Sequence, residues 1–266
     1  MDSLVKLASP EQGNARFLTF YYLTLPPNES VTMATQGHEH VLDVLSGACH
    51  VVVEDAEQRK IELGPVGKRA DIFSGMPEFV YVPRSCSYTV HGLESVCQVG
   101  IYSAPTGKPG TPVYILQDQV KALVSGASNW KRNVYIGLGG EGPATAMMVG
   151  ETHSPPGNWS GFPPHRHSFD QLPSEAQMEE LYFFQFDPPS GFAIGGVYED
   201  INNREGTARL SLVRHNQLFD VPGGYHFIAP CPGYQLNYIW ALGGPRCAFG
   251  AWVTDPDYAW LANYKE

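Results

Sequence analysis

Residues 219–244 read FDVPGGYHFIAPCPGYQLNYIWALGG, in which short apolar stretches alternate with turns rich in proline and glycine. Such a pattern predicts short β-strands, because proline and glycine interrupt longer elements. The Val-Pro turn at Val221 and Pro222 has a counterpart at Val82 and Pro83 in the first half of the chain. The repeat suggests two β-rich units of common ancestry, although two such common dipeptides could also coincide by chance.

The surrounding sequence extends this pattern in two blocks, from about residue 15 to 105 and from about residue 133 to 253. Apolar stretches that turn residues separate at short intervals favour a sandwich or barrel over alternating strands and helices. A stretch rich in proline and glycine, APTGKPGTP, reads as a linker between the blocks. We therefore predict an all-β chain of two tandem barrels, formed by residues 1–112 and 113–266.

Strands and short helices can be assigned within these barrels. Strands are expected at residues 17–25, 41–45, 49–53, 79–82, 96–102, 146–151, 180–186, 192–198, 208–215, 235–241 and 248–253. Helices are expected at residues 116–126 and 257–264.

Composition narrows the class of protein. The 266 residues include 17 basic and 27 acidic side chains, for a net charge of −10 with histidine neutral. This balance argues against binding to nucleic acid and against docking on anionic membranes. No apolar run is long enough for a membrane span or a signal peptide. The five cysteines form no CxxC pair, so we expect buried, reduced thiols and a cytoplasmic protein.

A group of histidines and a glutamate is the strongest candidate for a metal-binding site. The stretch GFPPHRHS contains His165 and His167, whose side chains would share one face of a strand. Glu180 opens the apolar stretch ELYFFQF, and His226 follows a glycine-rich turn. Three imidazoles and one carboxylate suit Zn²⁺, Mn, Fe(II), Co or Ni rather than Ca²⁺ or Mg²⁺. Glu179 is the alternative carboxylate, but Glu180 directly precedes the apolar strand.

These residues resemble the 5-deoxy-glucuronate isomerase family of bacterial inositol catabolism, which has a bicupin fold and is related to the uronate isomerases of pectin breakdown. The resemblance implies two cupin-like (jelly-roll) barrels with His165, His167, Glu180 and His226 as ligands of a divalent metal, zinc first. It also implies an aldose–ketose isomerase that converts 5-deoxy-glucuronate to 2-deoxy-5-keto-gluconate. Ser168 departs from the Asp that family members often carry, and a long insert precedes Glu180. The stretches that carry the resemblance are residues 40–53, 63–83, 101–105, 147–168, 179–186, 192–200 and 219–244.

Isomerisation of a sugar acid needs a proton shuttle and a cation for the substrate carboxylate. Tyr182 shares the strand face of Glu180, and Glu151 lies on the strand before the histidine pair, so both are candidate catalytic residues. A metal-bound hydroxide is the alternative. Arg132 and Arg214 are the candidates for binding the carboxylate. Arg166 ranks last, because it alternates away from the two neighbouring histidines.

The first block lacks this set of ligands. His38, Glu39 and His40 lie where the carboxylate would be expected, and Ser87 or Tyr88 occupies the place of the last histidine. We therefore expect a metal-free N-terminal barrel and a metal-binding C-terminal one. Two other classes stay open, an Fe(II) cupin dioxygenase and a non-catalytic sugar-acid-binding cupin. A small-molecule sugar acid is the expected partner, and a homo-oligomer is possible.

Overall fold

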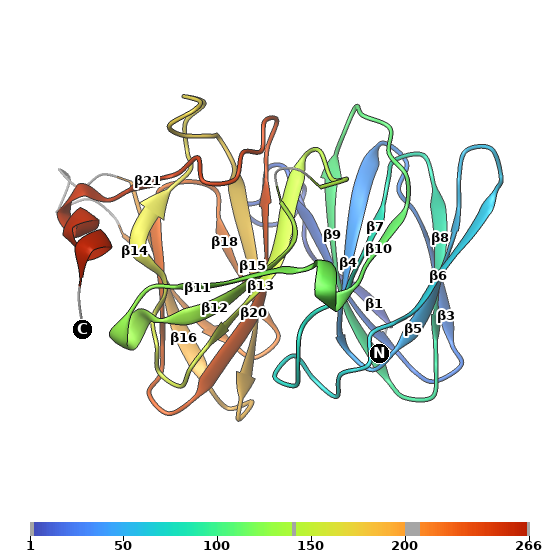
Figure 1. Ribbon diagram of the computed structural model, residues 1–266, viewed down its shortest axis with the longest axis horizontal. Coiled ribbons are helices and arrows are strands. Elements are labelled where there is room, and N and C mark those ends of the chain that lie inside the picture. The colour runs from blue at the N-terminus through green and yellow to red at the C-terminus, as the bar shows by residue number, and fades with distance from the viewer. Residues whose placement is uncertain (1–2, 140–141, 200–207, 265–266) are drawn as a thin grey trace.

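The computed structural model describes residues 3–139, 142–199 and 208–264, and most of these residues lie in β-strands or the turns between them (Figure 1). The N-terminal and C-terminal halves lie side by side along the longest axis of the molecule. Each half is built from two β-sheets. The prediction of an all-β chain with two successive β-sandwich units is therefore confirmed.

The N-terminal half contains a large sheet in the order β1-β2-β9-β4-β7-β10 and a smaller sheet in the order β3-β8-β5-β6. Neighbouring strands are antiparallel, so alternate residues of each strand face opposite sides of the sheet. The strands are β1 (Leu4–Ala8), β2 (Thr19–Leu25), β3 (Ser30–Ala34), β4 (His38–Ser46), β5 (Cys49–Glu54), β6 (Lys60–Val66), β7 (Phe79–Val82), β8 (Ser87–Gly92), β9 (Cys97–Pro105) and β10 (Val113–Ile115).

The C-terminal half contains a large sheet in the order β11-β12-β13-β20-β15-β18 and a smaller sheet in the order β17-β16-β19-β14-β21. The strands are β11 (Lys121–Ser125), β12 (Arg132–Leu138), β13 (Met147–Ser154), β14 (Ser160–Arg166), β15 (Glu179–Asp187), β16 (Phe192–Tyr198), β17 (Arg209–Arg214), β18 (Gln217–Val221), β19 (Tyr225–Pro230), β20 (Gln235–Gly243) and β21 (Val253–Thr254). Three short 3₁₀ helices are η1 (Gln117–Gln119), η2 (Ser128–Trp130) and η3 (Pro256–Asn263).

The same strand order occurs in both halves. The run β2-β9-β4-β7 of the first large sheet corresponds to β13-β20-β15-β18 of the second, and β3-β8-β5-β6 corresponds to β14-β19-β16-β17. The two Val-Pro turns follow equivalent strands, because Val82 ends β7 and Val221 ends β18. The repeated turn in the sequence therefore marks a repeated topology.

The large sheets of the two halves share one hydrophobic core. Phe20 of β2 lies against Phe183 of β15, with ring centroids 5.1 Å apart. The hydroxyl of Tyr102 on β9 lies 3.1 Å from the carbonyl oxygen of Ile239 on β20. These residues belong to a single cluster of buried apolar side chains drawn from both halves. Burial of this shared surface favours a fixed arrangement of the two halves.

The prediction of a helix at residues 116–126 is wrong. This segment contains the short helix η1 and then strand β11, which pairs with β12 from Lys121 opposite Ile136 to Ser125 opposite Arg132. Leu123 and Ser125 alternate onto one face, so this short segment follows the period of a strand. Pairing with β12 overrides the helical propensity of a stretch too short to form a stable helix alone. The helix expected at residues 257–264 is present as η3.

The prediction of a strand at residues 248–253 is also wrong. Only Val253 and Thr254 are extended and paired, in β21, and the preceding residues form a turn. Ala251 is buried in this turn, while Phe249 and Trp252 line a pocket. The apolar residues here are buried in a loop or line the pocket, so their sequence resembles that of a buried strand.

Two further expectations concern the thiols and the membrane. All five cysteines are free thiols, and the structure pairs none of them in a disulfide. In the parts of the chain that the structure describes, no helix is long and apolar enough to cross a membrane.

Candidate metal centre

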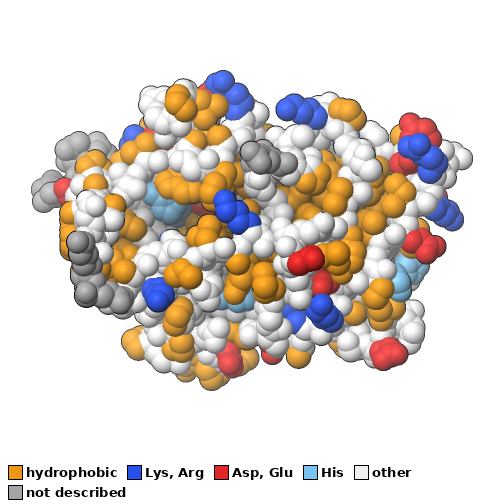
Figure 2. All heavy atoms as spheres, viewed as in Figure 1, with side chains coloured by type: hydrophobic (Ala, Val, Ile, Leu, Met, Phe, Trp, Pro, Cys, Tyr) orange, Lys and Arg blue, Asp and Glu red, His pale blue; other side chains and the backbone are white. Residues whose placement is uncertain are grey.

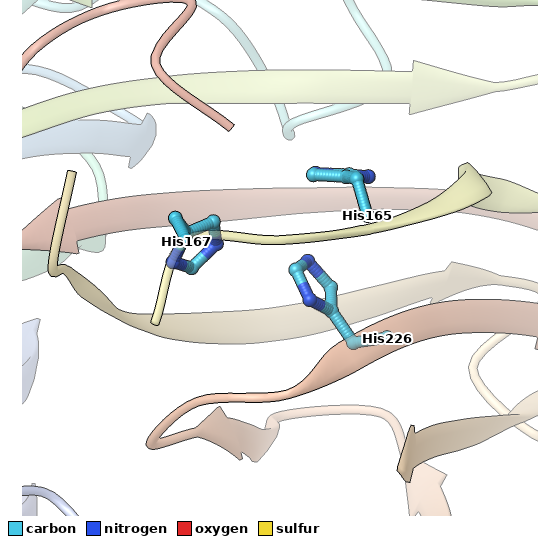
Figure 3. Close-up of side chains that lie close together, drawn as sticks. All are labelled: His165, His167 and His226. Carbon is cyan, nitrogen blue, oxygen red and sulfur yellow. The ribbon is translucent and has the colours of Figure 1, made fainter. Parts of the chain in front are cut away.

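Three histidines converge inside the C-terminal half. His165 lies on β14, His167 follows the end of that strand, and His226 lies on the adjacent β19 (Figure 3). His165 is the direct cross-strand partner of His226. One ring nitrogen from each histidine lies within 4.8 Å of the other two. This is the spacing expected of ligands that share one metal ion.

Backbone carbonyls fix the orientation of all three rings. The Nδ1 atoms of His165, His167 and His226 lie 3.1, 2.7 and 3.3 Å from the carbonyl oxygens of Pro163, Met178 and Gly224, respectively. A carbonyl oxygen only accepts hydrogen bonds, so each Nδ1 must carry the proton. A neutral ring then leaves its Nε2 lone pair free, and this is the tautomer that a metal ligand requires.

Glu180 on β15 completes the group. Its Oε2 atom lies 3.1 Å from Nε2 of His167 and 3.3 Å from Nε2 of His226. With neutral rings, these contacts bring lone pairs against a buried carboxylate, which is unfavourable unless a proton or a cation lies between them. Nε2 of His226 is fully buried and has no hydrogen-bond partner among the described residues. The donor set therefore fits a divalent metal held by three nitrogens and one carboxylate oxygen.

The surroundings of His165 and Glu180 favour the charge states in which these two residues bind a metal. Burial, followed by the neighbouring imidazoles, lowers the pKa of His165 to about 3, so this ring is neutral near pH 7. Burial alone would raise the pKa of Glu180, but the neighbouring imidazoles of His167 and His226 outweigh burial and lower that pKa. A neutral imidazole beside an ionised carboxylate matches the ligand forms that metals require.

Local interactions hold the two loops that flank the histidines. The Ser168 hydroxyl accepts a hydrogen bond of 2.8 Å from the backbone N–H of Gly224, in the turn that leads to His226. The insert after His167 folds back through the buried Glu175, which accepts hydrogen bonds from the N–H groups of Ser168 and Phe169. The serine at this position therefore ties the histidine pair to the strand that carries the third histidine.

His165, His167 and Glu180 line a pocket of about 340 Å³, and His226 lies behind them against Glu180. Figure 2 shows a hollow in this half of the molecule, with histidine visible among apolar side chains. Tyr182 of β15 and Tyr238 of β20 line its wall together with Trp240 and Trp252. Mostly apolar walls with a few convergent polar groups are typical of small-molecule sites.

Arg132 is a buried cation at this pocket. Its side chain is about nine-tenths buried, and its Nη1 donates to the carbonyl oxygens of Trp130 and Phe162 at 3.0 and 2.9 Å. No carboxylate of the described chain pairs with it. Burial lowers its pKa, which measures the cost of keeping this charge away from water. An anionic ligand would compensate that charge.

Glu151, one of the two candidate catalytic residues, lies outside the pocket. It is fully buried between the two halves, where it pairs with Arg69 of the N-terminal half and lies 2.7 Å from Nε2 of His153. Burial alone would raise its pKa, but Arg69 and His153 lower it to about 2. Strand alternation explains this position, since Thr152, its neighbour on β13, faces the pocket instead. The assignment of Glu151 as a catalytic residue is therefore corrected, because this residue joins the two halves of the molecule.

Arg214 also lies away from the pocket. It is exposed near the end of β17, where its backbone N–H donates to the side chain of Gln217. It does not line the pocket, so its assignment to substrate binding is corrected as well. Arg166 likewise faces outward, over the rings of Phe169 and Tyr225.

Other pocket residues were not singled out from the sequence. Tyr238 and Trp240 alternate onto the inner face of β20, so the period of that strand could have identified them. Thr152 could have been found in the same way on β13. Phe249 and Trp252 carry no such signal, because they lie in an irregular loop.

Two successive sandwiches, with a histidine-rich centre in the second, define a bicupin with a candidate metal site. An IolB-like protein of Salmonella typhimurium LT2 has this fold, with a TM-score of 0.88, 23% identity, and coverage of 98% of this chain and 100% of that one. An oxalate decarboxylase of Lactobacillus farciminis shares the fold at a TM-score of 0.70 and 13% identity, over 98% of this chain and 86% of that one.

Residues 3–261 match the KduI/IolB family, and the chain belongs to that family. The 5-deoxy-glucuronate isomerase of Geobacillus kaustophilus is 30% identical to it over 259 residues, which cover 97% of this chain and 90% of the relative. The family resemblance noted in the sequence is therefore confirmed.

Proposed function

We propose that this chain is a metal-dependent aldose–ketose isomerase of inositol catabolism that converts 5-deoxy-glucuronate to 2-deoxy-5-keto-gluconate. Membership of the KduI/IolB family and the activity named for its relatives support this reaction. The observation that carries the proposal is the convergence of three imidazoles and the Glu180 carboxylate beside a pocket that also contains Arg132, with which no carboxylate of the described residues pairs.

The metal would be held by His165, His167, Glu180 and His226. Three nitrogens and one carboxylate oxygen favour zinc, and they also suit Mn, Fe, Co or Ni. When bound, a divalent ion would supply Lewis-acid polarisation of the substrate carbonyl and its neighbouring hydroxyl. The backbone carbonyls at Nδ1 keep the three imidazoles aimed at this point before any substrate arrives.

Arg132 would bind the substrate carboxylate. The carbonyl of Phe162, which accepts a hydrogen bond from Arg132, lies three residues before His165 on the same strand. The two backbone positions are therefore at most about 11 Å apart. The guanidinium would hold the acid end in place while the aldehyde end reacts.

Tyr182 would act on the reacting end of the substrate. It lies on the same face of β15 as Glu180, and its hydroxyl is buried in the pocket near Tyr238 and Arg132. A buried phenol hydroxyl can donate a hydrogen bond to the oxygen that gains negative charge as the proton moves between C1 and C2. We propose Tyr182 as this donor, whereas Glu151 has no access to the pocket.

The remaining expectations extend this proposal. We propose that residues 1–112 form a metal-free barrel and residues 113–266 the metal-binding one, although β10, just after this boundary, pairs with β7 of the first half. We also propose that the protein works in the cytoplasm, where free thiols are stable, and that copies of the chain associate.

An assay on 5-deoxy-glucuronate, combined with elemental analysis of the purified protein, tests the proposed function. We expect about one divalent metal per chain and formation of 2-deoxy-5-keto-gluconate without oxygen consumption. Consumption of oxygen by an iron-loaded protein would instead indicate a dioxygenase. Binding of the sugar acid without turnover would indicate a non-catalytic sugar-binding protein. Either result would contradict the proposal.

A further inference from the structure

We propose that the N-terminal barrel positions the metal ligand Glu180, and that Glu179 is the positioning residue through which it does so. This inference rests on the metal centre proposed above. It assigns a role in the chemistry of the second barrel to the half of the molecule that lacks the ligands.

Strand alternation places the two glutamates on opposite faces of β15. Glu180 and Tyr182 face the pocket, whereas Glu179 and Leu181 face the N-terminal half. The residues on either side of Glu180 therefore both contact the other barrel. Any movement of these neighbours changes where the Glu180 carboxylate lies relative to His167 and His226.

The carboxylate of Glu179 is held by three backbone N–H groups of the N-terminal half. Arg16, Phe17 and Leu18 donate to it at 2.6, 2.8 and 2.5 Å. Glu179 is only 6% exposed, and no basic side chain pairs with it among the described residues. Hydrogen bonds from several N–H groups to one buried carboxylate are strong and directional. They fix β15 at the residue directly before the ligand.

A second contact fixes β15 at the residue after the ligand. The hydroxyl of Tyr102 on β9 lies 3.2 Å from the carbonyl oxygen of Leu181. Gly243, the cross-strand partner of Glu179, provides space for the first half to approach, since a Cβ there would lie 2.5 Å from the Leu18 side chain. The N-terminal half therefore holds the backbone on both sides of Glu180.

The repeat supplies a matched control. Glu39 on β4 occupies the position equivalent to Glu179, and it accepts hydrogen bonds from the backbone N–H groups of Thr145 and Ala146 in the C-terminal half. The residue after it is His40, which hydrogen-bonds Tyr88. Glu39 therefore makes the same kind of contact between the halves, but it does not adjoin a metal ligand.

The test compares Glu179→Gln with Glu39→Gln. Each substitution replaces one carboxylate oxygen, which accepts hydrogen bonds from backbone N–H groups, by an NH₂ group that cannot accept them. Both variants should therefore have a lower temperature of unfolding. We expect Glu179→Gln to weaken Zn²⁺ binding by up to about 10–100-fold, the range typical for loss of a group that orients a metal ligand. We expect Glu39→Gln to keep the affinity of the unchanged protein. Competition with a chelator measures the affinity, and the visible absorption of bound Co²⁺ reports the ligand arrangement.

Tyr102→Phe provides a second variant that removes only a hydroxyl. We expect a smaller loss of Zn²⁺ affinity than for Glu179→Gln, with a shifted Co²⁺ spectrum. Equal affinity and identical Co²⁺ spectra for Glu179→Gln, Tyr102→Phe and the unchanged chain would overturn the inference while leaving the metal centre intact. An unchanged chain that binds neither Zn²⁺ nor Co²⁺ would instead remove the proposed centre, and this inference with it.

Discussion

The two barrels use different side chains at four equivalent positions. In the second barrel, His165 pairs across strands with His226, and Glu180 pairs with Val221 at the Val-Pro turn. In the first barrel, the corresponding cross-strand pairs are Met33 with Tyr88 and His40 with Val82. Thr35 follows Met33 by two residues, as His167 follows His165.

The four side chains of the first barrel satisfy one another and the backbone. The Tyr88 hydroxyl lies 2.9 Å from Nδ1 of His40 and 3.2 Å from the sulfur of Met33. The hydroxyl of Thr35 donates to the carbonyl oxygens of Pro83 and Cys86. In the second barrel, by contrast, Nε2 of His226 has no hydrogen-bond partner in the part of the chain that the structure describes. The same arrangement of strands thus supports either a closed polar cluster or an open set of ligands, and four residues decide which.

Substitutions at the equivalent residues His226 and Tyr88 should have the most different effects of all the variants. His226→Ala removes a ligand, so we expect loss of bound metal and of isomerase activity with the fold largely retained. Tyr88→Phe, its counterpart in the first barrel, should cost only about 1 kcal/mol of stability and leave the metal content unchanged. Elemental analysis and circular dichroism of both variants check this. Full metal occupancy in His226→Ala would refute the ligand assignment.

The Glu151–Arg69 pair between the barrels should matter for stability rather than for chemistry. Glu151→Gln weakens the buried pair with Arg69, so the free energy of unfolding should fall by about 3–5 kcal/mol. Metal content of the folded protein should stay the same. Urea unfolding and elemental analysis measure the two effects separately. Loss of turnover in a variant of unchanged stability would return Glu151 to the list of catalytic residues.

Arg132 distinguishes the second barrel, because no carboxylate among the described residues pairs with its buried charge. Arg132→Met should lower kcat/KM for the sugar acid at least roughly 30-fold, because the substrate carboxylate would lose its buried partner. This corresponds to a loss of about 2–5 kcal/mol of transition-state stabilisation. Arg214→Met alters an exposed arginine and serves as the control. Steady-state kinetics with saturating metal check the comparison. Equal losses in the two variants would show that Arg132 has no special part in binding.

His40 should make the first barrel sensitive to acid. Burial, followed by the charge of His38, lowers the pKa of His40 from 6.5 to about 4. Below pH 6.5 the unfolded chain therefore takes up a proton that the folded chain refuses, and the free energy of unfolding falls as the pH drops toward 4. This group should contribute roughly 3 kcal/mol to that fall.

The His40→Asn variant isolates this contribution. Its free energy of unfolding, measured by urea titration from pH 7 to pH 4, should fall less steeply than that of the unchanged protein. Identical slopes for the two proteins would contradict the assignment of this pH dependence to His40.

Many of the central strands and the candidate ligands could be predicted from the sequence because they follow local rules. The period of a strand places His165 and His167 together, and the Val-Pro turns mark equivalent strands. Glu151 and Arg214 could not be placed in this way. The partner of Glu151 is Arg69, which is distant in sequence, and the exposure of Arg214 depends on which strand lies at the edge of the sheet.

The misassigned segments have a common cause. Residues 121–125 form a strand because β12 is available to pair with them, and residues 248–252 form a loop in which Phe249 and Trp252 line the pocket. Both outcomes depend on distant parts of the chain, so short local patterns do not determine them. The role proposed for Glu179 depends in the same way on N–H groups that lie more than 160 residues earlier, at Phe17 and Leu18.

An anomalous difference map from crystals grown with Zn²⁺ tests the central claim most directly. We expect one strong peak in the second barrel, about 2.0–2.2 Å from Nε2 of His165, His167 and His226 and from a carboxylate oxygen of Glu180. A fully occupied zinc site beside His38 and His40, with no density among the four residues of the second barrel, would contradict it.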